Sequence, residues 1–118
     1  MTDTQIETLE SVLGPAGVYV FSDYIPESSV LPAVSVSNVS FPSGRILTGR
    51  KTRQQEVWRI SVVAADKDTL YSTRDVVLSL DNSSNEHYQR IFVDMVNEEA
   101  KQEGEPNRRL FIDMTCTI

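Results

Sequence analysis

The stretch VWRISVVAADKDTL, residues 57–70, decides the fold of this chain. Its first eight residues alternate between two faces, and Trp58, Ile60, Val62 and Ala64 share the apolar one. This alternation predicts a β-strand. Val57 and Val63 also give the second face apolar character, which favours a central position in a sheet.

A helix is predicted to follow directly. Asp66 or Asp68 can cap its start by accepting a backbone hydrogen bond. Helical spacing then gives a core-facing stripe formed by Leu70, Thr73, Val76, Val77 and Leu80. Tyr71 and Leu78 fall on a different face of this helix, so a two-layer monomer does not need to bury them.

Upstream, the sequence predicts a helix over residues 1–13, where Ile6, Leu9, Val12 and Leu13 form one stripe. Gly14-Pro15 ends it. A brief apolar segment at 18–21, which could form a short strand, and a loop at 22–32 lead to a strand at 33–41. Residues 42–55 are expected to form a long hairpin loop to the Trp58 strand.

Downstream, two alternating segments at 88–95 and 109–118 predict an antiparallel hairpin with an acidic loop at its tip. The element order is therefore α-β-β-α-β-β. We expect one α+β domain over residues 1–118, a two-layer sandwich of a mostly antiparallel four-stranded sheet with both helices on one face. The helix-facing side is predicted to hold Trp58, Ile60, Val62, Ile91, Val93, Met95, Leu110, Ile112, Met114 and Cys116. The opposite side is predicted to hold Arg59, Ser61, Arg90, Phe92, Asp94, Phe111, Asp113 and Thr115.

Two aromatic residues on the second face, Phe92 and Phe111, are then exposed in a monomer. With Tyr71 and Leu78 they indicate apolar surface that a partner covers. The alternative is that the loop at 22–32 folds over them.

The composition is that of an ordinary globular domain with a net charge of −6, which argues against general DNA binding. The single cysteine allows no disulfide within the chain, so a reducing compartment is the simplest expectation. We expect no secretory signal and no membrane span, because no apolar run approaches the roughly 20 residues that a spanning helix needs.

Catalytic and ligand-binding patterns are weak. His87 and Cys116 could form a nucleophile pair, but Cys116 is predicted to face the core, where cysteine behaves as a small apolar residue. The acidic loop lacks the calcium-binding pattern, and Gly44 and Gly49 do not form a phosphate-binding loop. We expect no catalytic residues, no metal and no cofactor.

Two charged segments are candidate interfaces. The first is basic and contains Arg45, Arg50, Lys51 and Arg53. The second is acidic and contains Glu98, Glu99, Glu103 and Glu105. They could be two independent solvated loops, or the basic loop of one subunit could meet the acidic loop of the next in a head-to-tail ring.

The order of these segments resembles a known family. A helix is followed by GVYV at 17–20, LPAVSV at 31–36, the segment at 57–66, a helix with Leu70, Val76, Val77 and Leu80, and a closing hairpin. This arrangement is similar to the tail terminator, or tail completion, proteins of long-tailed bacteriophages. The long segments at 42–55 and 98–107 can depart from typical members, which leaves a neighbouring neck protein as an alternative.

The resemblance implies a subunit of a homo-oligomeric ring, typically a hexamer, at the head-proximal end of the virion tail and assembled in the host cytoplasm. Its implied partners are the tail tube protein and the head connector, with DNA passing through unbound and no membrane involved. A ferredoxin-like ligand-binding or regulatory domain, monomeric or dimeric, is the main alternative, and a small enzyme is the third.

Overall fold

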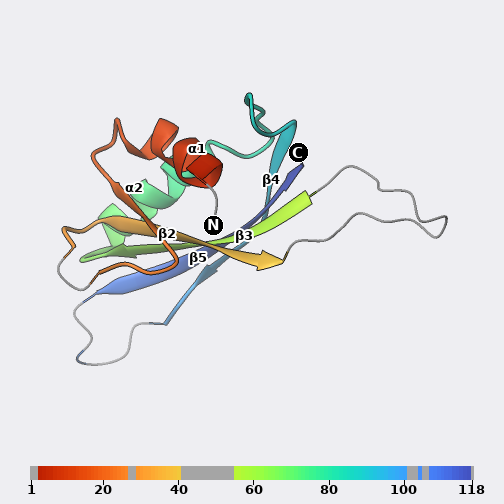
Figure 1. The fold of residues 1–118 in the computed structure, drawn as a ribbon. Helices are drawn as coiled ribbons and strands as arrows, with labels where there is room; N and C mark the ends of the chain where they lie inside the picture. The colour runs from red at the N-terminus through yellow and green to blue at the C-terminus, as the bar shows by residue number, and fades with distance from the viewer. Residues whose placement is uncertain (1–2, 27–28, 41–54, 101–103, 105–106, 118) are drawn as a thin grey trace.

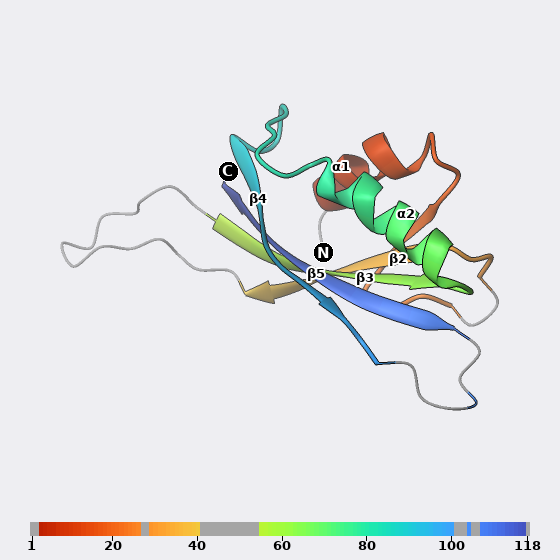
Figure 2. The same ribbon diagram turned by 180° about the vertical axis from the view of Figure 1, so that it is seen from behind.

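A computed structural model describes residues 3–26, 29–40, 55–100, 104 and 107–117. Two helices cover one face of a five-stranded sheet, while most of the other face is open (Figures 1 and 2). The elements are α1 (Asp3–Leu13), β1 (Tyr19–Ser22), β2 (Ala33–Ser40), β3 (Gln55–Ala64), α2 (Lys67–Leu78), β4 (Arg90–Glu98) and β5 (Arg108–Thr117). The predicted α+β class and the two helices on one face are confirmed.

The sheet differs from the prediction in its strand count and in one pairing. Its order is β1-β2-β3-β5-β4, and β1 lies parallel to β2 at the edge. All other pairs are antiparallel. The prediction of four strands was wrong because a parallel pair is joined by a connection that leaves no local pattern in the sequence.

The central strand is β3, as the sequence predicted. It pairs with β5 along its full length from Gln55 to Ala64, and with β2 from Val57 to Val63. Trp58, Ile60 and Val62 are fully buried beneath the helices. The Trp58 ring meets the Tyr88 ring edge-on with 5.2 Å between centroids, a favourable aromatic geometry.

Local chemistry explains where α2 begins and where α1 ends. The Asp66 carboxylate accepts a hydrogen bond from the Thr69 N–H at 2.8 Å, so Asp66 rather than Asp68 is the N-cap of α2. At the end of α1, a Cβ on Gly14 would lie 2.7 Å from the Glu10 carbonyl oxygen. Glycine is therefore required at this position.

Candidate assembly surface

The predicted interface residues are only partly described by the structure. Arg45, Arg50, Lys51, Arg53, Glu103 and Glu105 lie outside the described residues. The described members are Tyr71, Leu78, Phe92, Glu98, Glu99 and Phe111. Of these, the structure brings Tyr71 and Glu98 into direct contact.

Tyr71 and Leu78 are less exposed to a partner than the sequence suggested. Both are partly buried and pack against the core. The Tyr71 hydroxyl donates to Glu98 Oε2 at 2.8 Å, and this bond to a carboxylate raises the pKa of the phenol. The Arg74 guanidinium lies 4.7 Å from the centre of the Tyr71 ring. The surface of α2 is thus largely satisfied within the subunit.

The sheet face opposite the helices carries an ion pair between two strands. Arg59 of β3 donates to both carboxylate oxygens of Asp113 of β5, at 3.0 and 3.3 Å, and this pairing raises the pKa of Arg59. The Arg59 guanidinium also lies 5.9 Å from the centre of the Phe111 ring. Thr115 donates a hydrogen bond to Asp94 on the same face. Arg59, Asp113 and Asp94 thus each have a partner within the subunit.

Apolar side chains are concentrated on β4. Phe92 is 45% exposed and Met95 is 57% exposed, while Val96 is 41% exposed. The prediction that Met95 faces the helices was wrong, because the register shifts between Val93 and Met95. This β-bulge adds one residue and moves the following side chains to the other face of the sheet.

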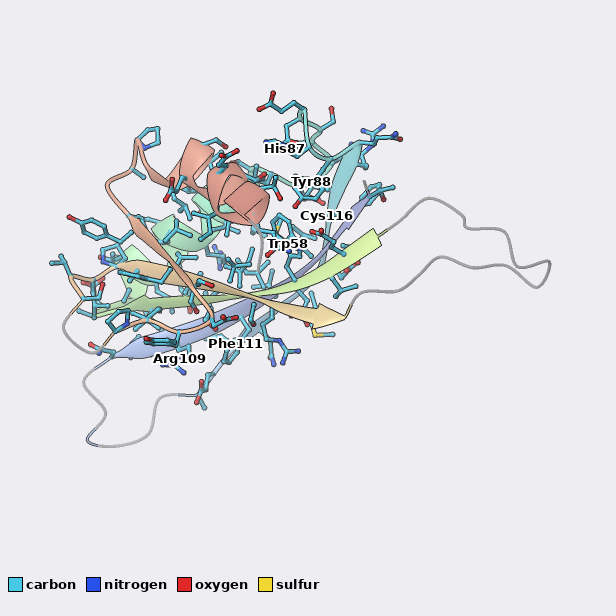
Figure 3. The ribbon with its side chains drawn as sticks, in the orientation of Figure 1. Trp58, His87, Tyr88, Arg109, Phe111 and Cys116 are labelled. Carbon is cyan, nitrogen blue, oxygen red and sulfur yellow. The ribbon has the colours of Figure 1, made fainter. Side chains whose placement is uncertain are left out.

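The connection from β1 to β2 crosses part of the open face. It lies over Ser35 and Val63, which are 5% and 6% exposed. Two hollows of about 340 and 170 Å³ remain beneath it, and Arg109 and Ile25 line both. Figure 3 places Arg109 and Phe111 on the side of the sheet away from the helices. The predicted alternative of a covering loop thus holds for this end of the face but leaves Phe92 and Met95 exposed.

A buried polar cluster on the helix side was not anticipated from the sequence. Glu56 Oε2 accepts hydrogen bonds from Trp58 Nε1 at 2.9 Å, Gln5 Nε2 at 3.0 Å and the Tyr88 hydroxyl at 3.0 Å. Burial is the main reason that the pKa of Tyr88 is raised. The sequence did contain a sign of this cluster: Glu56 and Trp58 share a strand face, and a buried indole N–H needs an acceptor.

The two residues considered for catalysis have separate environments. Cys116 is fully buried in the core, and burial raises the pKa of its thiol to about 12. His87 Nε2 lies 3.1 Å from Glu7 Oε2 and 3.4 Å from Glu86 Oε1. Figure 3 shows both residues on the helix side of the sheet. His87 contacts two exposed carboxylates, and the thiol of Cys116 is neutral at ordinary pH.

Within the described part of the chain, no three His, Cys, Asp or Glu side chains are grouped as a metal site would require. None of the helices in the described ranges has the length and apolar character needed to cross a membrane.

Comparison with known proteins identifies a fold. No protein-family model matches the chain, and no curated protein sequence matches it either. A solved structure described as "Virion of native gene transfer agent (GTA) particle" contains a chain with the same fold, with a TM-score of 0.52 and 19% sequence identity. The match covers 92% of this chain and 82% of that chain. The fold of this chain is therefore similar to that of a chain in a virion particle.

Proposed function

We propose that this chain is a structural virion protein of a tailed bacteriophage or a phage-like particle, and specifically the tail terminator subunit. The observation that carries the proposal is the fold similarity to a chain of a gene transfer agent virion over 92% of this chain. The order of the sequence segments, which resembles tail terminators, is independent support. The role is structural rather than catalytic, and no cofactor takes part.

The proposed mechanism is geometric. Copies of the chain join head to tail into a ring of six subunits, by analogy with the family that the sequence resembles. One face of the ring binds the last ring of the tail tube and stops its growth, and the other face receives the head connector. DNA passes through the centre, where a net charge of −6 per subunit does not favour binding of phosphates.

The exposed part of β4 and the charges of the chain support assembly. Phe92 and Met95 lie on the face that no helix covers, and both are more than two-fifths exposed. Residues 42–55 carry Arg45, Arg50, Lys51 and Arg53 without an acidic residue, whereas Glu98 and Glu99 lie at the end of β4. Such charges set the register and the choice of partner between subunits more than the affinity.

The test is a charge reversal of Arg50, Lys51 and Arg53 together to glutamate. We expect the variant to remain folded but to assemble or join tails poorly, because the basic segment no longer attracts the acidic one. Circular dichroism measures folding, and light scattering after size exclusion measures the mass. Reversing the charge of Lys67, an exposed basic residue at the start of α2, is the control and should leave assembly intact. Normal rings and normal infectivity in the triple variant would refute this interface.

One observation favours a second function. The larger hollow under the β1–β2 connection, about 340 Å³, is near the lower end of the size range of small-molecule sites. A ligand-binding or regulatory domain would use it as a monomer or dimer. A discrete species near six subunits across a concentration series would exclude this alternative.

A further inference from the structure

The outer edge of β4 is covered for only half of its length. At the start of the strand, the Ile91 N–H donates to the Ser83 carbonyl at 2.9 Å, and the Val93 N–H donates to Asp81 Oδ1 at 2.8 Å. The segment after α2 therefore closes this part of the edge. Beyond the bulge, β4 is the last strand of the sheet, and no described residue pairs with its outer side.

In the open half of β4, the backbone groups that point away from β5 can be identified. Glu99 donates its N–H to the Arg109 carbonyl at 3.0 Å, toward β5. Backbone groups alternate in direction along an antiparallel strand, so those of Val96 and Glu98 point away from β5. Unpaired N–H and C=O groups in a row are a template for another strand.

Side chains around these groups limit the kind of strand that can pair with this edge. β4 contains neither lysine nor proline, the residues that commonly block edge pairing. Met95 and Val96 are exposed on opposite faces of the sheet, and Asp94, Glu98 and Glu99 surround them with negative charge. An extended segment with apolar residues and flanking positive charges would match the unpaired backbone groups, the exposed apolar side chains and the negative charge of this edge.

This chain contains one segment with that chemistry. Residues 42–55 include four of the 11 basic residues of the chain and no acidic residue. Ile46, Leu47 and Thr48, which combine apolar and β-branched side chains, lie between Arg45 and Arg50.

The described residues that flank the basic segment lie at the opposite end of the sheet from the open half of β4. Residues 42–55 join β2 to β3, and Gln55 pairs with Thr117 at that end of the sheet. Glu98 pairs with Leu110, which lies opposite Val62 of β3. Seven residues along β3 separate these two rows, about 23 Å at 3.3 Å per residue. Figure 1 shows the tip of β2 and the end of β4 at opposite ends of the sheet.

We propose that residues 94–98 of β4 are a strand-addition site for the basic segment Arg45–Arg53 of a second copy of the chain. The inference rests on the proposed self-assembly and names its contact. Because each copy carries the acceptor at one end and the donor segment at the other, the contact is head to tail, which is the type that can close into a ring.

The experiment uses the full chain at a concentration where light scattering gives the mass of one subunit. A synthetic peptide of residues 42–55 is added, and hydrogen exchange of individual amides is followed by NMR. We expect exchange at Val96 and Glu98 to slow by about tenfold or more, as hydrogen-bonded strand amides do. Ile91 and Val93, whose amides are already bonded, are internal controls and should not change.

A charge exchange separates strand addition from nonspecific attraction. Glu98→Lys with Glu99→Lys should abolish protection by the native peptide and restore it with a peptide in which the four basic residues are glutamate. Glu99→Lys alone, which keeps the Tyr71–Glu98 bond, should weaken protection partly without changing the thermal midpoint. No protection at Val96 and Glu98, or protection that the charge exchange does not follow, would overturn the inference.

The failure of this contact is distinguishable from the failure of the proposed function. A six-subunit ring of the full chain in which Val96 and Glu98 still exchange rapidly would overturn strand addition and leave the ring standing. A chain with protected β4 amides that never caps a tail tube would keep the contact and contradict the terminator function.

Discussion

A single buried carboxylate, that of Glu56, joins three parts of the chain. It accepts hydrogen bonds from Gln5 of α1, Trp58 of β3 and Tyr88 just before β4. All three donors are neutral, so removal of the carboxylate would leave them without this acceptor in a buried setting. Buried polar groups that lose their partner destabilise a protein more than the bond itself contributes.

Glu56→Ala should therefore lower the free energy of unfolding by about 3 kcal/mol. Urea unfolding followed by Trp58 fluorescence measures it. Glu10→Ala, which truncates an exposed glutamate of α1, is the matched control and should be nearly neutral. Equal stability of the two variants would show that the Glu56 cluster contributes little.

Cys116 gives a pH dependence with a definite sign. Burial raises the pKa of its thiol from the ordinary 9.0 to about 12, so the folded state keeps a proton that the unfolded state loses first. This contribution is fully present below pH 9 and is lost as the pH rises from 9 to 12. Tyr88, whose pKa is also raised, acts in the same direction at higher pH.

The thermal midpoint should thus fall above pH 9. The midpoint of Cys116→Ala should fall less steeply, because the contribution of the thiol is gone while those of Tyr71 and Tyr88 remain. Calorimetry over pH 8–11 measures both slopes. Identical slopes would contradict the role of the thiol.

At the scale of elements, the N-cap of α2 has the clearest local cause. The Asp66 carboxylate accepts from the Thr69 N–H, and this bond lowers the pKa of Asp66 below its ordinary 3.8. The stabilisation is therefore present above about pH 4 and is lost as the pH falls through the lowered pKa.

Asp66→Ala should lower the thermal midpoint at pH 7 because it removes the cap. Asp68→Ala in the same turn is the control and should change the midpoint less. The gap in thermal midpoint between wild type and Asp66→Ala should close as the pH falls through the lowered pKa of Asp66. A gap that persists unchanged below that pKa would contradict a charged cap.

The sequence predicted elements well where a pattern is local. The alternation around Trp58 identified the central strand, and the one around Ile112 identified its neighbour. Two features escaped it. β1 is four residues long and pairs with a strand beyond a loop, so its place depends on tertiary contacts. The bulge beside Met95 is a backbone irregularity that side-chain periodicity cannot reveal.

On the candidate surface, too, features with a local pattern were predicted and features that depend on tertiary contacts were not. Exposure of Phe92 followed from strand alternation. Tyr71 was expected to be spare, but it binds Glu98, a residue 27 positions away that no helical pattern could connect to it. The exposure of Met95 and Val96 on the open edge depends on the bulge, which strand alternation does not predict.

In the whole molecule, the two faces of the sheet differ from each other, and so do its two ends. Helices cover one face, the other is mostly open, and the segment between β2 and β3 leaves the sheet at the end opposite Glu98. A subunit with different chemistry at its two ends favours heterologous contacts, which form rings or filaments rather than isolated dimers. This polarity fits a protein that must end a tube on one side and receive a head on the other.

The most direct measurement is the growth of tail tubes in the presence of the purified chain. Tail-tube subunits from the same phage are polymerised with and without it, and electron microscopy records tube lengths and ends. The tail-terminator account predicts that growth stops and that each tube carries a ring of this chain at one end only. Tubes that grow to the same lengths in its presence, with no chain bound at either end, would contradict it.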